Sequence, residues 1–208
     1  MNKSQTDTNI SSDEQIVEGI LNGEKQLYEK LMRKYDQRLF RIGRSIINDE
    51  AEVRDIMQTT YLNAYLQLPS LQNKSNFGTW VIKILVNESL LRKKRKLKQQ
   101  QTLNKQLSNE METPLKSLLN KELKTLLEKA IVELPEKYKL VFVMREVEEM
   151  STNETMEVLR LSESNVKIRL SRSKEMLREK LSGKKLKEVF KLKVPHCDWI
   201  VNYVMNKI

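Results

Sequence analysis

Basic side chains recur at helical spacing in the stretch VKIRLSRSKEMLREKL, residues 166–181. At 100° per residue, its apolar positions collect on one side of a helix and its polar positions on the other. The polar side carries Lys167, Ser171, Arg172, Glu175 and Arg178. Long cationic side chains bind phosphate groups and donate hydrogen bonds to guanine edges. This side therefore either contacts a nucleic acid or is an ordinary solvated helix surface.

The residues before this stretch favour contact with DNA. Ser151 and Glu154 form an S-x-x-E capping box, which opens a short helix that ends near Leu159. After a short turn, Ser162 is a suitable N-cap for the next helix. Two short helices joined by three or four residues make a helix-turn-helix, whose second helix enters the major groove. Here the second helix is the basic stretch.

Charge is segregated along this part of the chain. Residues 164–193 hold eleven Lys or Arg and three Glu, whereas residues 144–163 hold six Glu and two Arg. The whole chain has 38 basic and 28 acidic residues, a net charge of +10. This balance favours a polyanionic partner, either a nucleic acid or an anionic membrane. Solvation alone does not require such polarisation.

Composition excludes several other classes of protein. With five Gly and four Pro in 208 residues, the chain lacks the turns that many short strands need. It has no run of eighteen apolar residues, and its first fifteen residues lack the apolar core of a secretory signal. We therefore expect a cytoplasmic protein without membrane insertion. The single cysteine, Cys197, excludes an internal disulfide, and with His196 it makes only a weak zinc site. No cofactor and no catalytic residues are expected.

These residues need helices to position them, and apolar spacing predicts an all-α fold. Two small helical domains are expected, joined by a polar linker, with the helix-turn-helix in the second and a short C-terminal helix after it. The predicted boundaries are a disordered N-terminus 1–12, a first domain 13–97, a linker 98–114, a second domain 115–182 and an extension 183–208.

The combination of stretches resembles the bacterial RNA polymerase sigma factors, in particular the small extracytoplasmic-function (ECF) group. DEAEVRDIMQTTYLNAYLQL (49–68) is similar to the helix that binds core polymerase. FGTWVIKILVNESLLRKKRK (77–96) is similar to the helix that flanks the −10 promoter element. The stretch 133–181, which begins ELPEKYKLVFVMREVEEMS, is similar to the domain that reads the −35 element. The polar linker lies where the family places one, and the likeness covers nearly all of 13–181.

The resemblance implies a function and a set of partners. A sigma factor is not a catalyst: it gives the polymerase a promoter address and holds the strands apart during melting. The implied partners are the RNA polymerase core and promoter DNA, double-stranded at −35 and melted at −10. An anti-sigma factor is left open.

The resemblance also assigns residues to these contacts. On the helix similar to the core-binding one, the contact face is Asp55, Gln58 and Thr59, whereas Ile56, Tyr61, Leu62 and Tyr65 are expected in the core. In the family the loop 69–76 takes a base flipped out of the non-template strand, and a basic cluster follows at RKKRK (92–96). The residues implied at −10 are Gln72, Asn73, Lys74, Asn76, Arg92, Lys93 and Arg95. Those implied at −35 are Lys167, Arg169, Ser171, Arg172, Lys174 and Arg178, with Lys167 and Arg172 nearest the bases.

Two positions depart from the family pattern. Met156 stands where the first helix of the helix-turn-helix usually has a small residue, and Arg160 stands where the turn usually has Gly. Gly suits a left-handed C-cap, and another residue there costs about 1 kcal/mol.

The tail VPHCDWIVNYVMNKI carries an apolar stripe of helical spacing. Its members are Cys197, Ile200, Val201, Val204, Met205 and Ile208. So short a helix rarely forms alone in water, so we expect the stripe to dock on the chain's own domains, most simply on 115–181. It would either modulate DNA or polymerase binding or only add packing.

Three other classes of protein remain open at this point. A helix-turn-helix regulator that works without polymerase would not need the stretch 49–96 and would usually dimerise. A basic helical scaffold for membranes or acidic proteins would bind weakly and lose its binding in salt. A metal enzyme would have to use His196 and Cys197.

Overall fold

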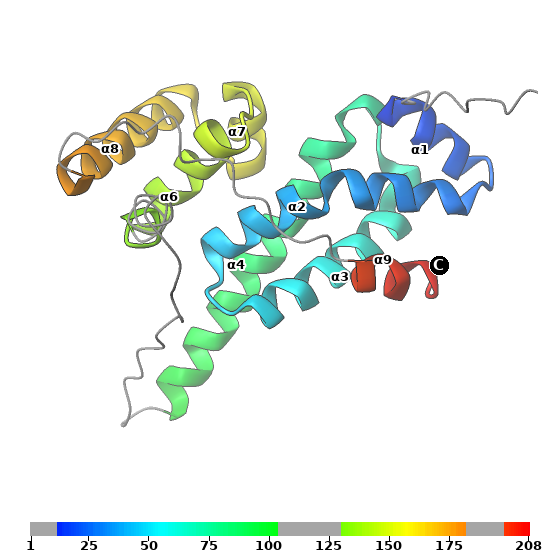
Figure 1. Ribbon diagram of the computed structural model, residues 1–208, viewed down its shortest axis with the longest axis horizontal. Helices are drawn as coiled ribbons and strands as arrows, with labels where there is room; N and C mark the ends of the chain where they lie inside the picture. Colours follow the sequence, from blue (N-terminus) through cyan, green and yellow to red (C-terminus); the bar gives the residue numbers. More distant parts are fainter. Residues whose placement is uncertain (1–11, 104–129, 182–197) are drawn as a thin grey trace, which may run out of the picture.

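The computed structural model describes residues 12–103, 130–181 and 198–208, and in these ranges the regular elements are helices, with no strand (Figure 1). The long elements before the first gap are α1 (Asp13–Leu21), α2 (Tyr28–Ile46), α3 (Glu50–Gln67) and α4 (Phe77–Leu103). Those after it are α6 (Glu136–Phe142), α7 (Thr152–Leu159), α8 (Glu163–Leu181) and α9 (Asp198–Met205). Short turns of 3₁₀ helix lie at Lys25–Leu27 (η1), Leu68–Ser70 (η2) and Lys74–Asn76 (η3), and a π-helical turn lies at Val143–Val147 (η4). The expected all-α fold is confirmed.

Helices α2, α3 and α4 pack on one another and form the first helical group, together with α1. Buried aromatic residues join them: the Tyr28 hydroxyl donates to the Tyr61 carbonyl oxygen at 2.7 Å, and the Tyr61 hydroxyl donates to that of Met32 at 3.1 Å. Helices α2 and α3 approach closely at Gly43, where an added Cβ would lie 2.8 Å from a methyl group of Val53. The side chain of Asp49 caps α3 by accepting from two backbone N–H groups.

Helix α4 is longer than expected. The sequence predicts a polar linker from residue 98, but the helix continues to Leu103. The reason is that KQQQTL contains no glycine or proline and three glutamines and a lysine that favour helix. Of the predicted linker, residues 104–114 lie outside the described ranges.

The second helical group contains α6, η4, α7 and α8, and its local structure follows the sequence signals. Ser151 and Glu154 form the predicted capping box at the start of α7. Arg160 ends this helix in the left-handed conformation, with φ 52° and ψ 49°. The Ser162 hydroxyl then accepts from the backbone N–H of Asn165 at the start of α8. The predicted helix-turn-helix is therefore present.

The two groups pack directly against each other, with α4 on α7 and α2 on α6. Apolar residues of the second group join the buried cluster of the first: Leu140, Val143, Met144, Met150 and Val158. The sequence predicts two domains and a linker but contains no periodic signal for this contact.

The last helix docks on the first group, not on the second. Ile200, Val201 and Val204 are buried in the cluster of α2–α4, and α9 contacts α2 and α3 (Figure 1). The prediction that the stripe docks within the chain is confirmed for these residues, but the prediction of 115–181 as its site is wrong. Eleven of the nineteen residues of α2 are buried, and α9 covers part of this helix together with α1, α3, α4 and α6. Cys197 lies outside the described residues.

Candidate nucleic-acid interface

The polar side of α8 is open to solvent. Lys167, Ser171, Arg172 and Arg178 are exposed, whereas Val166, Ser173 and Leu177 are buried. Helix α8 packs against α6 and α7. Lys167 pairs with Glu163 one turn earlier at 2.6 Å, and its hydrogen bond and charge lower the pKa of the Glu163 carboxyl group. This surface can receive an anionic ligand without any rearrangement of the helix.

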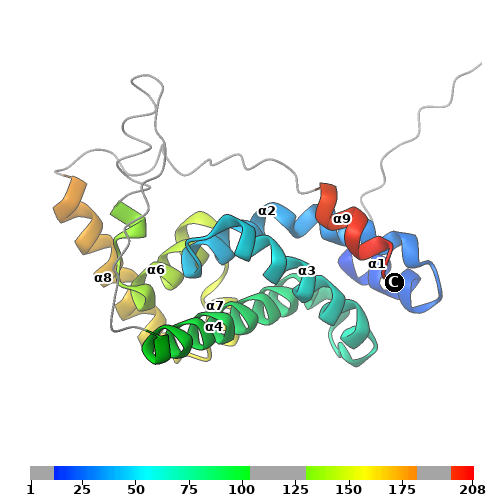
Figure 2. The ribbon, with the colours of Figure 1, turned by 90° about the horizontal axis from the view of Figure 1, so that it is seen from below.

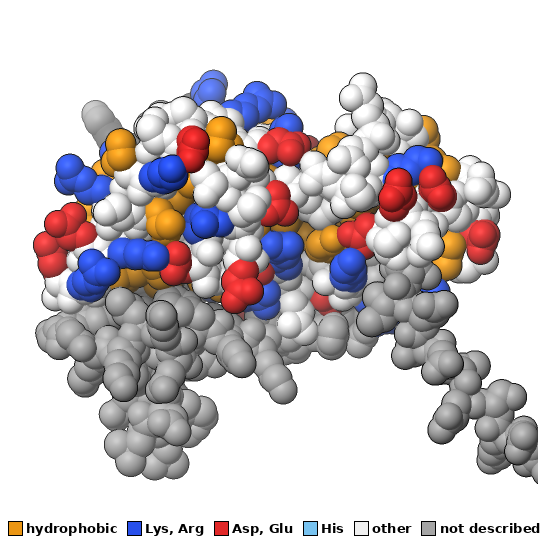
Figure 3. Space-filling view, turned by 90° about the horizontal axis from the view of Figure 1, so that it is seen from above, with side chains coloured by type: hydrophobic (Ala, Val, Ile, Leu, Met, Phe, Trp, Pro, Cys, Tyr) orange, Lys and Arg blue, Asp and Glu red, His pale blue; other side chains and the backbone are white. Residues whose placement is uncertain are grey.

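Arg169 and Lys174 lie at the border of this surface and are half-buried, as the helical spacing predicts. The Lys174 ammonium lies 2.7 Å from a carboxylate oxygen of Glu146 in the π-helical turn. Figure 3 shows basic and acidic side chains interspersed over the part of the molecule that α6, α7 and α8 build. On the face that this view shows, the cations therefore do not form one continuous basic stripe.

The basic cluster at 92–96 is largely occupied by carboxylates. Arg92 and Lys96 of α4 both pair with Glu52 of α3, at 3.2 and 2.9 Å. Lys93 pairs with Glu136 of the second group, and burial together with the nearby charge of Lys93 lowers the pKa of the Lys139 ammonium group. Arg95 is exposed.

The loop before α4 consists of η2 and η3 with a short extended segment between them. Gln72 and Asn73 are exposed there, and the Ser75 hydroxyl donates to the Asn73 side-chain oxygen at 2.6 Å. Lys74 pairs with Glu18 of α1 at 3.1 Å. Asn76 donates from its side-chain nitrogen to Glu157 of α7 at 3.2 Å. The structure therefore brings this loop beside the first helix of the helix-turn-helix.

The three residues assigned to polymerase contact lie on α3. Asp55 and Thr59 are exposed and Gln58 is half-buried. The Thr59 hydroxyl donates to the backbone carbonyl oxygen of Asp55 at 3.1 Å, which fixes its orientation along the helix. Ile56 and Tyr61 are buried as predicted, while Leu62 and Tyr65 are only partly buried against the core.

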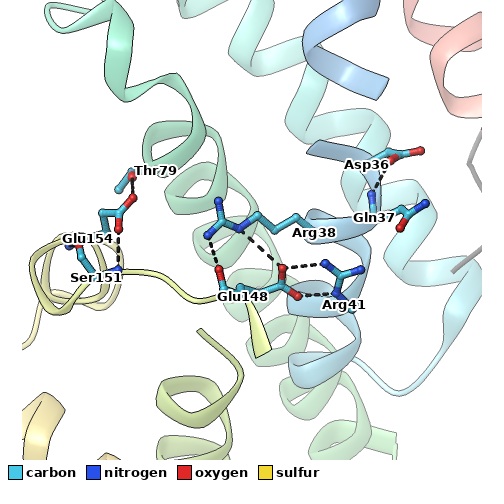
Figure 4. A network of polar contacts seen from close by, with 8 residues as sticks. All are labelled: Asp36, Gln37, Arg38, Arg41, Thr79, Glu148, Ser151 and Glu154. Atoms are coloured by element: carbon cyan, nitrogen blue, oxygen red, sulfur yellow. Dashed lines mark hydrogen bonds and ion pairs between the residues drawn. The ribbon is translucent and has the colours of Figure 1, made fainter. Parts of the chain in front are cut away.

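The residue most important for the contact between the two groups is one that the sequence analysis did not single out. Glu148 has only 3% of its side chain exposed, and its carboxylate accepts from the Arg41 guanidinium at 2.5 and 2.8 Å (Figure 4). Arg38 donates to the backbone carbonyl oxygen of Glu148 at 2.7 Å. The hydrogen bond that Arg41 donates to Glu148 raises the pKa of the Arg41 guanidinium, which stays charged. In the sequence, the only feature that points to such a contact is the excess of acidic residues in 144–163.

Two further acidic residues extend this contact along α7. Glu154 accepts from the Thr79 hydroxyl at 3.2 Å (Figure 4), and Glu157 lies 3.5 Å from the Lys83 ammonium. Burial alone raises the pKa of the Glu154 carboxyl group. The hydrogen bonds that this group accepts from Ser151 and Thr79 outweigh burial, so the net shift of the pKa is downward. The acidic side of the helix-turn-helix thus occupies part of the surface of α4 and its preceding loop. Of the residues assigned to the −10 element, Asn76 is bound by Glu157 of α7, and Lys93 is bound by Glu136 of α6.

Within the described ranges, no three acidic, His or Cys side chains converge in a way that would hold a metal ion, and no helix there is long and apolar enough to cross a bilayer. His196 lies outside those ranges, as does Cys197.

Comparison with known proteins identifies the family. Residues 31–98 match the family described as Sigma-70 region 2, and residues 124–177 match the one described as Sigma-70, region 4. The chain belongs to the sigma-70 family. Its relatives place it among the ECF sigma factors: it is 23% identical over 176 residues to the ECF RNA polymerase sigma factor SigW of Bacillus subtilis, with 79% of this chain and 94% of that protein covered. It is 24% identical over 181 residues to the ECF RNA polymerase sigma-E factor of Haemophilus influenzae, with 82% and 95% covered.

Two solved structures share the fold. One is the sigma factor RpoE in complex with the anti-sigma factor NepR from Bartonella quintana, with a TM-score of 0.56, 20% identity, and 80% of this chain and 99% of that chain covered. Another is CnrH in complex with the cytosolic domain of CnrY, with a TM-score of 0.60, 19% identity, and 84% and 100% covered. The region 4 match contains α7 and α8 up to residue 177, so the helix-turn-helix of this sigma factor lies in its region 4.

Proposed function

We propose that this sigma factor binds core RNA polymerase, directs it to promoters with two DNA elements and assists strand separation. The observation that carries the proposal is that region 2 and region 4 occur on one chain, with the cationic side of α8 open to solvent. A helix-turn-helix regulator that works alone would need no region 2, which disfavours that alternative. The chain acts as an initiation subunit without catalytic residues of its own, in the cytoplasm where polymerase and DNA are found.

We assign the first group, with boundaries at 13–97 plus the end of α4, to core binding and the −10 element. Its polymerase contact is the exposed side of α3 with Asp55, Gln58 and Thr59. The −10 contacts are assigned as the resemblance implies: Gln72, Asn73, Lys74, Asn76, Arg92, Lys93 and Arg95. The exposed polar groups of the loop suit hydrogen bonds to an unstacked base edge, and the cations of α4 suit sequence-independent phosphate binding.

We assign the second group, 115–182, to the −35 element. Lys167 and Arg172 lie on the exposed side of α8 and are long enough to reach guanine edges. Ser171 lies between them, Arg178 lies further along the same side, and the half-buried Arg169 and Lys174 suit backbone contacts.

An anti-sigma partner also fits this proposal. Two similar solved proteins are bound to partner proteins, and in one of them a sigma factor is bound to a partner named as an anti-sigma factor. A partner that holds the two groups together would keep the occupied residues Asn76 and Lys93 from DNA.

Run-off transcription with purified core polymerase, on DNA from upstream of the gene itself, tests the proposal. We expect transcripts only when core and this chain are both present. Arg172→Ala should reduce promoter binding by roughly 1–3 kcal/mol and relax specificity at the −35 element, because a bidentate base contact is lost.

Lys180→Ala is the matched control for this experiment, because Lys180 is an exposed cation of α8 that pairs with Glu133. It should leave specificity unchanged. Binding to the same DNA with equal affinity in the absence of core would instead support the regulator that works alone.

A further inference from the structure

Helix α9 is structurally part of region 2, although it follows region 4 in the sequence. Ile200 and Val204 have no exposed surface and Val201 has 2%, all within the cluster of α2–α4. The Lys25 ammonium donates to the backbone carbonyl oxygen of Ile208 at 2.7 Å, which holds the end of this segment beside η1. Figure 2 shows α9 beside α2 and α3, on the opposite side of them from α4 and at the far end of the molecule from α8.

The chain therefore leaves the region 2 group after α4, builds the region 4 group and returns to region 2 at α9. The second group is connected to the first by two stretches, 104–129 and 182–197. A polypeptide spans at most about 3.3–3.6 Å per residue. The upper limits are therefore about 90 Å for the first stretch and about 60 Å for the second, whatever conformation they adopt. The shorter connection limits how far region 4 can move from region 2 while α9 stays docked.

Promoter geometry makes this limit relevant. Base pairs are stacked about 3.4 Å apart, so elements centred about 25 base pairs apart are separated by about 85 Å. This separation of about 85 Å exceeds the maximum length of about 60 Å that residues 182–197 can span. The widths of the two domains therefore have to cover the remaining distance. Each additional base pair between the elements stretches the connection further. When the two groups are packed against each other, as in this structure, α9 can stay docked on α2 and α3.

We propose that α9 anchors the chain on α2 and α3, so that residues 182–197 set an upper limit on the promoter spacer that this sigma factor accepts. The proposal rests on the proposed function, because it requires that both elements are bound at once. In this view α9 is a specificity-determining element: it reads no base, but it discriminates against promoters whose two elements lie too far apart. A tethered site contributes to binding only where the tether spans the distance.

The experiment is run-off transcription with core polymerase on promoters that are identical except for spacer length. One variant carries Ile200→Asp and Val204→Asp, which places two charges in the buried side of α9 and releases it. Its matched control carries Asn202→Asp and Asn206→Asp, the same charges on exposed positions one helical turn apart. A third variant has eight Gly and Ser residues inserted within 182–197, which leaves every described residue in place.

The wild-type protein and the control variant should lose activity steeply beyond one spacer length. The released and the lengthened variants should retain activity on longer spacers, on the order of tenfold above wild type on a promoter just beyond the limit. If the lengthened variant, whose folded parts are intact, shows the same spacer dependence as wild type, the proposal is overturned. If the wild-type protein supports no core-dependent transcription at any spacer, the proposed function fails instead, so the two failures are distinguishable.

Discussion

At the scale of single residues, the turn of the helix-turn-helix contains a strained backbone conformation at Arg160. Arg160 has φ 52°, a conformation in which a side chain clashes with the following backbone. The sequence predicts this, because Arg160 occupies a position where the related pattern has glycine. The strain is tolerated because α7 is held by its capping box and by its contact with α4. Glu149, two residues before the N-cap of α7, has a similar φ of 53°.

Replacing Arg160 with glycine should therefore stabilise the protein. We expect Arg160→Gly to raise the free energy of unfolding by about 1 kcal/mol, since glycine adopts a left-handed conformation without the steric penalty. Chemical denaturation followed by circular dichroism measures this change. Arg160→Ala is the matched control, because alanine removes the long side chain but keeps the Cβ that causes the strain. A gain of equal size in both variants would contradict the explanation.

At the scale of elements, short sequence signals such as helix caps predict where helices begin. They do not predict which helices pack against each other. The capping box at Ser151 and the N-cap at Ser162 placed α7 and α8 correctly, because each cap acts within three residues of its own position. The docking site of α9 could not be predicted, because an apolar stripe shows that a helix needs a partner but not which one. The sequence predicts the end of α4 too early, because the polar residues after 98 are typical of a linker, although glutamine and lysine also favour helix.

The residues that we propose to contact DNA divide in the same way: some follow from local signals and others depend on contacts distant in sequence. The exposed side of α8 follows from helical periodicity alone, and its residues lie where the sequence predicts. The pairing of Lys93 with Glu136 and of Asn76 with Glu157 joins elements that are 43 and 81 residues apart in sequence. The residue spacing within one helix cannot predict contacts between residues so far apart in the sequence.

Helix α3 supplies a prediction at this scale. Charge reversal at Asp55 combined with Gln58→Ala should weaken the binding of core polymerase, because Asp55 is exposed and both residues lie on the face assigned to that contact. Helix content should not change, since neither side chain is fully buried. A pull-down of core polymerase measures binding, and far-ultraviolet circular dichroism measures helicity.

Glu14→Lys on α1 is the control for this prediction, because it makes the same change of net charge at an exposed position of the same group. Undiminished core binding by the Asp55 and Gln58 variant would remove α3 from the polymerase interface.

At the scale of the whole molecule, the two regions form one packed body in which the acidic side of region 4 lies on a basic part of region 2. The arrangement explains the segregated charge of the sequence: residues 144–163 supply carboxylates to the first group, and the residues after 164 leave their cations facing outward on α8. Binding two promoter elements at once requires that these groups separate, since α7 lies against the loop and helix assigned to −10. The pair of the buried Glu148 and the partly buried Arg41 is a polar contact that separation has to break.

Charge reversal at Glu148 should therefore open the molecule. Glu148→Lys removes the carboxylate that Arg41 binds and adds a third cation beside Arg38 and Arg41, and removing one member of a buried pair costs roughly 3–5 kcal/mol. We expect a larger radius of gyration in small-angle scattering and easier access of DNA to Asn76 and Lys93. Glu149→Lys is the matched control, because the neighbouring side chain is exposed and undergoes the same change of charge. Arg41→Glu combined with Glu148→Arg restores an opposite pair and should recover part of the compact form. An unchanged radius of gyration in Glu148→Lys, with the same thermal stability, would mean that apolar packing alone holds the two regions together.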